Sequence, residues 1–133
     1  MNKNISHLKQ STPPAKILPI LEHTKSCYLV WYENYLKVPK SHRYTLALKI
    51  DNLFIEIIEG IAIATFLQKN EKIAWLNFSI RKLETLNLLL QILWETKSLN
   101  DKKYIQISNK LNEIGKMLGG WRGKITENKN SPK

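Results

Sequence analysis

His23 and Cys27 are the first residues in this sequence whose types and spacing could support chemistry. They are four residues apart, so on a helix both would lie on one face and could share a metal ion. Zinc needs three or four protein ligands, and no second His or Cys pair is present to complete the set. We therefore interpret them as a half-exposed histidine beside a partly buried cysteine.

Glutamates that repeat along two segments could form a di-iron site. Such a site takes a Glu-x-x-His motif from each of two helices. Here Glu56 is followed three positions later by Glu59, and Glu84 by Asn87, so the histidines are missing. We interpret Glu56, Glu59, Glu84 and Glu95 as carboxylates on solvated or interfacial helix faces.

Motifs of the common enzyme classes are absent from the sequence. It contains no Gly-rich phosphate loop after a strand, no HExxH zinc motif and no GxSxG nucleophile elbow. We therefore expect a protein that is not an enzyme, with no catalytic residue, metal, cofactor or small-molecule substrate.

Basic side chains give the clearest chemical signal. Lys and Arg number 21 against 11 acidic residues, a net charge of +10, which favours polyanions or acidic protein surfaces as partners. Lys102 and Lys103 follow the predicted start of a helix, where the helix dipole disfavours cations, and Arg81 carries a planar fork suited to phosphate or carboxylate. An ordinary solvated helix face explains each residue equally well when it is taken singly. The candidate contacts to nucleic acid or a protein partner are Lys37, Lys40, Arg43, Arg81, Lys82, Lys103, Lys110 and Lys116.

The net charge is unevenly distributed along the chain. Residues 1–16 and residues 119–133 contribute +3 each, and residues 17–118 contain 14 basic and 10 acidic side chains, which leaves +4. The end segments would add a loose, salt-sensitive attraction. Specific recognition must therefore depend on a few residues between them.

Composition excludes several other classes of protein. The single cysteine cannot form an intramolecular disulfide, so a disulfide-stapled secreted domain is excluded. The longest uncharged run, residues 85–94, is far too short to span a membrane, and the polar N-terminus does not resemble a signal peptide. We expect a cytoplasmic protein that does not bind membranes.

Apolar periodicity predicts four long helices in residues 17–121. The chain has five Gly and five Pro, with no Pro between Lys40 and Ser131. These are too few turn-forming residues for a β-sandwich or β-barrel. Apolar residues recur three and four apart in residues 17–37, 42–67, 71–97 and 101–121. In the first of these segments the stripe consists of Ile17, Leu21, Thr24, Tyr28, Trp31, Tyr35 and Val38.

The predicted boundaries follow from capping residues. Ser41, Asn70 and Asn100 could cap the second, third and fourth helices, and Gly119 and Gly120 suit a left-handed stop of the last one. Short connections between amphipathic helices favour an up-down-up-down four-helix bundle over residues 17–121. Residues 1–16 and 122–133 are predicted to be flexible basic tails.

The second and third predicted helices are apolar on more than one face. One buried stripe does not need so many apolar residues, so either the second helix lies centrally in the bundle or its second face packs on another subunit. We expect a homo-oligomer. The residues predicted to form its interface are Leu48, Ile55, Ala62, Phe66, Phe78, Leu88 and Ile92.

Three segments resemble one protein family. They are residues 38–46 (VPKSHRYTL) with the Glu59–Gly60 step, residues 111–121 (LNEIGKMLGGW), and the Trp31–Tyr32 pair. Together they are similar to the Avd proteins, the accessory variability determinants of diversity-generating retroelements. The similarity spans residues 18–121. A related group comprises the helical-bundle proteins encoded by intervening sequences in 23S rRNA genes.

The resemblance implies a four-helix protomer that assembles into a barrel-like homopentamer with a basic surface. It also implies binding to the reverse transcriptase of the retroelement and to RNA or DNA, in support of mutagenic cDNA synthesis and retrohoming. The chemistry would then belong to the polymerase. The alternative is a structural or adaptor oligomer, either without nucleic acid or associated with rRNA like the intervening-sequence proteins.

Overall fold

The computed structural model describes the backbone of residues 18–130 and the side chains of residues 19–127. This part of the chain is helical and contains no strand, so the predicted all-α class is confirmed. The predicted tail of residues 1–16 lies outside the described residues. The helices are α2 (Leu18–Tyr35), α3 (Lys40–Arg43), α4 (Leu46–Thr65), α5 (Lys69–Glu95) and α6 (Asp101–Asn130).

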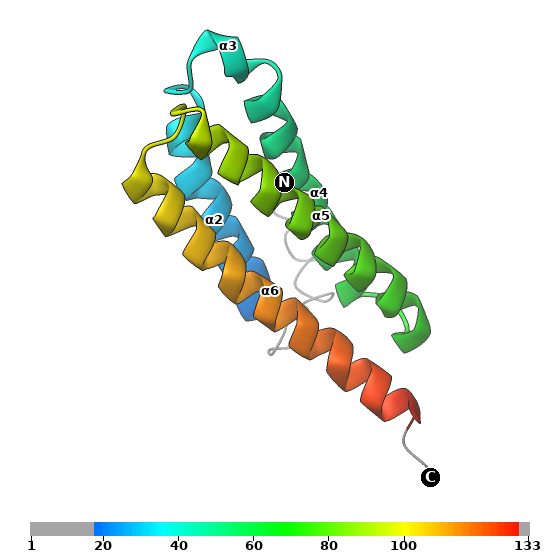
Figure 1. Cartoon of the computed structure of the whole chain (residues 1–133). Helices are drawn as coiled ribbons and strands as arrows, with labels where there is room; N and C mark the ends of the chain where they lie inside the picture. Colours follow the sequence, from blue (N-terminus) through cyan, green and yellow to red (C-terminus); the bar gives the residue numbers. More distant parts are fainter. Residues whose placement is uncertain (1–17, 131–133) are drawn as a thin grey trace, which may run out of the picture.

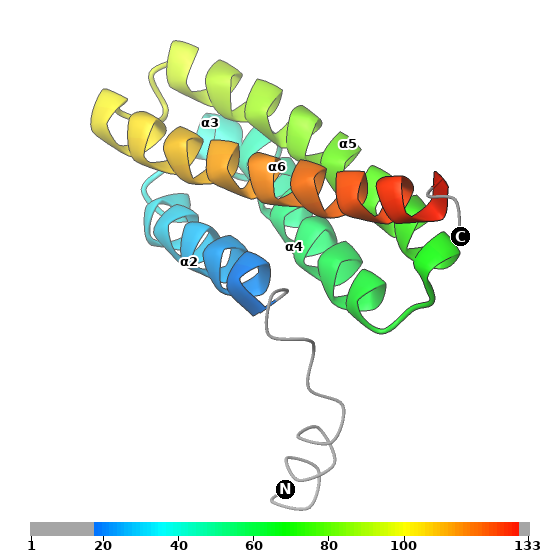
Figure 2. The same cartoon turned by 90° about the horizontal axis from the view of Figure 1, so that it is seen from below.

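The four long helices lie side by side, and each runs opposite to the long helix before it (Figure 1). Helix α4 contacts α2 and α5, and α6 contacts the same two helices from the other side. Figure 2 shows α6 lying across α2 and α5 when the molecule is seen from below. The short helix α3 turns the chain between α2 and α4.

The core of α4 matches its predicted stripe and extends beyond it. Its sequence predicts a stripe of Leu46, Ile50, Leu53, Ile57, Ile61 and Ala64, and all of these are buried except Leu46, which is half-buried. Helix α4 also buries Ala47, Phe54 and Gly60. A helix that packs against two neighbours buries a wider arc than one stripe, which explains part of its apolar surplus.

The buried face of α2 matches the predicted stripe in part: Thr24 and Trp31 are buried as predicted, and so is Val38 just after the helix. The face is centred on Cys27 and Trp31, whereas the predicted Tyr28 and Tyr35 lie at its edge and are only partly buried. The indole of Trp31 is fully buried, stacks on Phe54 at a centroid distance of 6.2 Å, and donates a hydrogen bond to Asp51 Oδ1 (3.1 Å). Placing this largest side chain between α2 and α4 sets the rotation of α2.

Two of the three predicted caps are wrong. Ser41 lies inside α3, because Pro39 starts a separate turn there, and α4 begins only at Leu46. Helix α5 begins before Asn70, because the carbonyl of Gln68 already accepts from the amides of Glu71 and Lys72. Asn100 caps α6 as predicted, since its Oδ1 accepts from the Lys103 amide (2.8 Å).

The predicted end of the last helix at Gly119 and Gly120 is also wrong. Helix α6 continues to Asn130, past the start of α2 and beside the first part of α5 (Figures 1 and 2). Ile125 is buried, and Arg122 Nη1 donates to Asn77 Oδ1 of α5 (3.0 Å). Tertiary contacts beyond the glycines therefore outweigh their low helix propensity.

Lys72 closes the end of α4. Its Nζ donates to the carbonyls of Ala64 (2.6 Å) and Thr65 (3.0 Å), which have no partner within α4. The same ammonium lies 5.8 Å from the ring centre of Trp121, so it links α4, α5 and α6. Burial lowers the pKa of Lys72 below its usual value.

Gly60 allows α4 and α5 to approach closely. A Cβ at this position would clash with Ser79 Oγ and would lie 3.2 Å from Phe78 Cδ2. Ser79 is fully buried and its hydroxyl donates to the Trp75 carbonyl (2.9 Å), so it cannot move aside without losing that bond. A side chain at Gly60 would therefore push the two helices apart.

We predict opposite effects for two glycine substitutions. Gly60→Ala should lower the free energy of unfolding by roughly 1–3 kcal/mol, because it overpacks the α4–α5 contact. Gly123→Ala should raise it by up to about 1 kcal/mol, because a Cβ there meets nothing within 4 Å and alanine favours the helix. Urea unfolding followed by circular dichroism measures both.

The cause of the Gly60 effect can be isolated in a double variant. Ser79→Ala removes the hydroxyl that the new Cβ would meet, so Gly60→Ala combined with Ser79→Ala should recover most of the lost stability. Equal stability of Gly60→Ala and the unsubstituted protein would contradict the close contact.

Candidate nucleic-acid interface

Basic side chains from two connections, α2–α4 and α5–α6, gather at one end of the molecule. Lys37 follows α2, Lys40 lies in α3, Lys97 follows α5, and Lys102 and Lys103 lie in the first turn of α6. Figures 1 and 2 show α3 and the α5–α6 connection at the same end. His42 Nδ1 of α3 lies 2.9 Å from Ser98 Oγ of that connection, so the two segments are in direct contact. We call residues 36–45 and 94–103 the basic end.

The basic end carries most of the net charge of the helical part of the chain. It contains six basic and two acidic side chains, a net charge of +4. Residues 18–130, which form the helices, contain 17 basic and 11 acidic side chains, a net charge of +6, so the helical residues outside the basic end carry only +2. A positive field localised at one end attracts a polyanion to that end.

Arg43 has a structural role at the basic end. Its Nε donates to the Val38 carbonyl (3.1 Å) and its Nη2 to the Leu36 carbonyl (2.9 Å), both just after α2. In return, the Tyr35 hydroxyl donates to the Arg43 carbonyl (3.2 Å). The arginine therefore adds its charge to the basic end, while much of its hydrogen-bonding fork is occupied by backbone.

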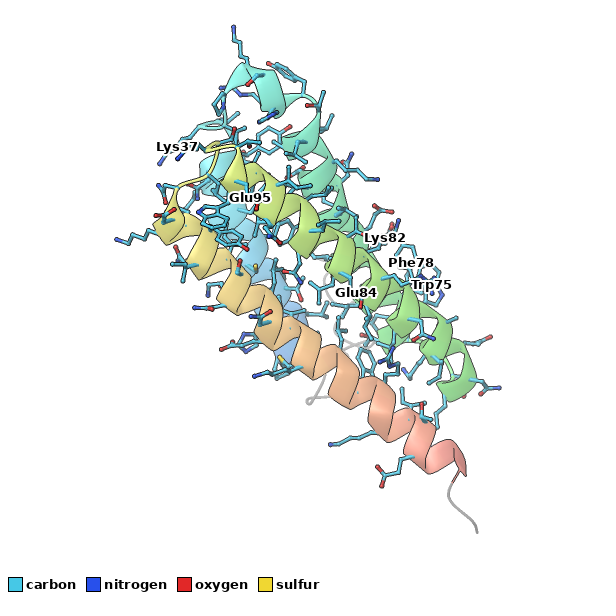
Figure 3. All side chains as sticks on the ribbon, in the orientation of Figure 1. Lys37, Trp75, Phe78, Lys82, Glu84 and Glu95 are labelled. Atoms are coloured by element: carbon cyan, nitrogen blue, oxygen red, sulfur yellow. The ribbon has the colours of Figure 1, made fainter. Side chains whose placement is uncertain are left out.

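Arg81 and Lys82, both predicted contacts, lie away from the basic end in the middle of α5. Lys82 Nζ forms an ion pair with Glu56 Oε2 of α4 (3.4 Å) and lies 5.3 Å from the ring centre of Phe78. Figure 3 shows Lys82 with Phe78 and Trp75 on one side of α5. Arg81 is exposed, and its side chain makes no hydrogen bond or ion pair to the residues that the structure describes.

The three predicted lysines of α6 are spread along that helix. Lys103 lies at the basic end, with its Nζ 3.5 Å from Gln106 Oε1. Lys110 is half-buried and close enough to Cys27 to favour its thiolate, and Lys116 is exposed further along. Of the eight predicted residues, the structure therefore brings together Lys37, Lys40, Arg43 and Lys103.

Lys97 also belongs to the basic end, although the sequence did not indicate it as a candidate contact. It was treated as the last residue of a helix, whereas the structure places it in the turn after α5. For Lys102, the position at a helix start, where the dipole disfavours a cation, was the sequence signal for a contact to a partner.

A shallow cavity of about 560 Å³ lies beside these residues at the α5–α6 turn. Trp94 stacks on Tyr104 at 4.6 Å, and its Nε1 donates to Asp101 Oδ1 (2.7 Å). Because Glu95 and Asp101 outnumber Lys97 in the lining, the cavity itself does not suit an anion. The lining residues are Trp94, Glu95, Lys97, Leu99, Asn100 and Asp101.

Apolar side chains outside the core form a second feature of the surface. Of the residues predicted to form a subunit interface, Ala62 and Phe78 are half-buried, and the other five are exposed: Leu48, Ile55, Phe66, Leu88 and Ile92. Further exposed apolar residues that were not predicted are Leu29 and Tyr32 of α2 and Leu36, which directly follows it. Their spacing of three and four was visible in the sequence, but only one face of α2 was considered.

His23 and Cys27, first considered as metal ligands, differ in burial: the cysteine lies in the core and the histidine lies at the surface. Cys27 is fully buried, and burial raises the pKa of its thiol to about 12, so the metal-binding thiolate is scarce at neutral pH. The His23 ring is half-exposed, with Nδ1 3.9 Å from Glu113 Oε2. Within residues 19–127, no three His, Cys, Asp or Glu side chains are grouped closely enough to hold a metal ion.

None of the helices in the described part of the chain combines the length and the apolarity that a bilayer requires.

Comparison with known proteins gives one match. The family described as bAvd-like matches residues 20–125, which covers α2 to α6. Searches of curated proteins and of solved structures returned no match. The matched region contains the three segments on which the sequence resemblance depended and extends past Gly119 and Gly120 into the last part of α6. The chain therefore belongs to the bAvd-like family.

Proposed function

We propose that this protein is a non-catalytic accessory factor of a diversity-generating retroelement that binds its reverse transcriptase and its template RNA or cDNA. Membership of the bAvd-like family supports the retroelement role. The observation that carries the nucleic-acid role is the concentration of net charge at the basic end.

The chemistry of the basic end fits a phosphodiester backbone. Lys37, Lys40 and Lys102 are exposed, and none forms an ion pair with the residues that the structure describes. Lysine is a point charge that attracts phosphate oxygens without reading base sequence. Binding would therefore tolerate many sequences and weaken steeply with salt, because released counterions supply much of its free energy.

The apolar faces support self-association. On α4, Leu48, Ile55 and Ala62 recur every seven residues on the side that faces neither α5 nor the core. Leu29 and Tyr32 of α2, with Leu36 directly after it, are further exposed apolar side chains. A four-helix-bundle protomer with such faces would bury them against further copies, and the family resemblance favours a homopentamer.

A reverse transcriptase is the protein partner that this proposal requires. Assembly of several protomers would repeat the basic end around a common axis, so that one polymerase and its template could contact several copies. A purely structural oligomer that meets no nucleic acid is the alternative that the following experiments separate from this proposal.

Removal of charge from the basic end should weaken nucleic-acid binding. We predict that the triple variant Lys37→Gln, Lys40→Gln, Lys102→Gln lowers affinity for single-stranded RNA and reduces the slope of log K against log salt by about 2, at about 0.7 for each lost contact. Fluorescence anisotropy over a salt series measures both quantities.

The matched control removes three exposed lysines elsewhere, with Lys25→Gln, Lys69→Gln and Lys124→Gln. It changes the net charge equally, so the two triple variants differ in position and in the exposed Lys25–Glu22 ion pair (3.4 Å) that the control removes. Equal losses in the two triple variants would show that total charge, rather than the basic end, determines binding.

A charge in the apolar face of α4 should disrupt assembly. We predict that Ile55→Asp shifts size-exclusion elution towards the monomer and leaves helical circular dichroism largely unchanged, because Ile55 is 48% exposed in the protomer. Asn109→Asp adds the same charge at an exposed position of α6 and serves as the control. Unaltered elution of Ile55→Asp would place Ile55 outside the interface.

The polymerase partnership is tested by co-purification. We expect the tagged protein to retain a co-expressed reverse transcriptase of a diversity-generating retroelement, with nuclease treatment reducing but not abolishing recovery, because protein contacts remain. Complete loss after nuclease would show that nucleic acid alone bridges the two. No recovery under either condition would favour the structural alternative.

A further inference from the structure

Lys97 has an unusual backbone conformation for a lysine. Among the described residues it is the one non-glycine residue with a positive φ, 67°. The turn around it is closed by two hydrogen bonds, from the Lys97 amide to the Trp94 carbonyl (2.9 Å) and from the Ser98 amide to the Leu93 carbonyl (3.0 Å). This is a Schellman-type helix end, whose left-handed position is most often occupied by glycine.

The conformation makes lysine a poor residue for stability at this position. A Cβ is unfavourable in the left-handed region, and glycine avoids that strain. A cation after the end of a helix gains some interaction with the helix dipole, but solvent and salt screen this gain at an exposed position. Lys97 is exposed and forms no ion pair with any described carboxylate, so no contact within the protomer explains a lysine here.

Its place at the basic end suggests what the side chain does. Lys97 precedes Ser98, whose hydroxyl contacts His42 of α3, so it lies in the α5–α6 connection beside that contact and five residues before Lys102. The two turn hydrogen bonds fix the backbone from which its ammonium projects. A lysine held on a rigid turn loses less conformational freedom on binding than one on a mobile segment.

We propose that Lys97 is a phosphate-contacting residue of the nucleic-acid interface, kept at the left-handed position of the α5 turn at the expense of fold stability. The inference rests on the proposed nucleic-acid binding. It adds one contact residue, whose charge favours binding and whose backbone conformation lowers the stability of the fold. Substitution should therefore move stability and affinity in opposite directions, which a residue with only a structural role would not do.

Three substitutions separate charge from backbone conformation. Lys97→Gly removes both the strain and the charge, Lys97→Asn removes the charge and tolerates positive φ, and Lys97→Arg retains both. Lys69→Gln, at the opposite end of α5, is the control for loss of one exposed positive charge. The measurements are the thermal midpoint and the affinity for a fluorescein-labelled 20-nucleotide RNA of mixed sequence over a salt series.

We expect Lys97→Gly to raise the thermal midpoint by about 2–5 °C and to bind the RNA more weakly, with a salt slope smaller by about 0.7. Lys97→Asn should show the same loss of binding with a smaller gain in midpoint, and Lys97→Arg should match the unsubstituted protein in both. Lys69→Gln should leave the affinity nearly unchanged.

Two results would overturn the inference while leaving the proposed function intact. One is an unchanged affinity and salt slope of Lys97→Gly in a protein that otherwise binds the RNA. The other is an unchanged or lowered thermal midpoint, which would show that lysine is not strained at this position. If the unsubstituted protein fails to bind RNA at any salt concentration, the proposed nucleic-acid function falls, and this inference falls with it.

Discussion

The close approach of α4 and α5 at Gly60 is the constraint on which the rest of the structure depends. With no side chain at Gly60, the buried hydroxyl of Ser79 fits against the backbone of α4. This contact fixes the register of the two antiparallel helices, so that Glu56 meets Lys82 at one level. At the next turns it brings Lys72 under the end of α4, where its ammonium also reaches Trp121 of α6. One small residue thereby determines how three helices are aligned.

The basic residues of this chain have two different roles. Arg43 and Lys72 donate to carbonyls at the ends of α2 and α4, and Lys82 pairs with a glutamate across two helices. These cations stabilise the fold because they bind carbonyls near helix ends or a carboxylate between two helices. Four exposed lysines, Lys37, Lys40, Lys97 and Lys102, lie where the α2–α4 and α5–α6 connections meet. A count of charges in the sequence does not distinguish the two roles, because the partner of each cation is distant in sequence or belongs to the backbone.

Much of the fold could be predicted from the sequence, because the apolar stripes of α4, α5 and α6 are regular. The stripe of α2 was partly misplaced, since its rotation depends on where Trp31 fits beside Phe54, a contact between helices. The end of α6 was also misplaced, because local propensity favours a stop at Gly119 and Gly120, while Arg122 and Ile125 make contacts that only the fold supplies. For the candidate site, local reasoning found Lys37, Lys40 and Lys103, but it could not show that α3 touches the α5–α6 connection.

The burial of Cys27 allows thiol alkylation to measure how often the contact between α2 and α6 opens. It is the single cysteine of the sequence, its side chain is inaccessible, and its Sγ lies 3.9 Å from the Ile107 carbonyl across the α2–α6 contact. Because burial also suppresses the reactive thiolate, an alkylating reagent reaches this sulfur only after α2 separates from α6. The rate of alkylation then measures how often that separation occurs. A slower rate in an assembled form would show that α2 is clamped by neighbouring subunits.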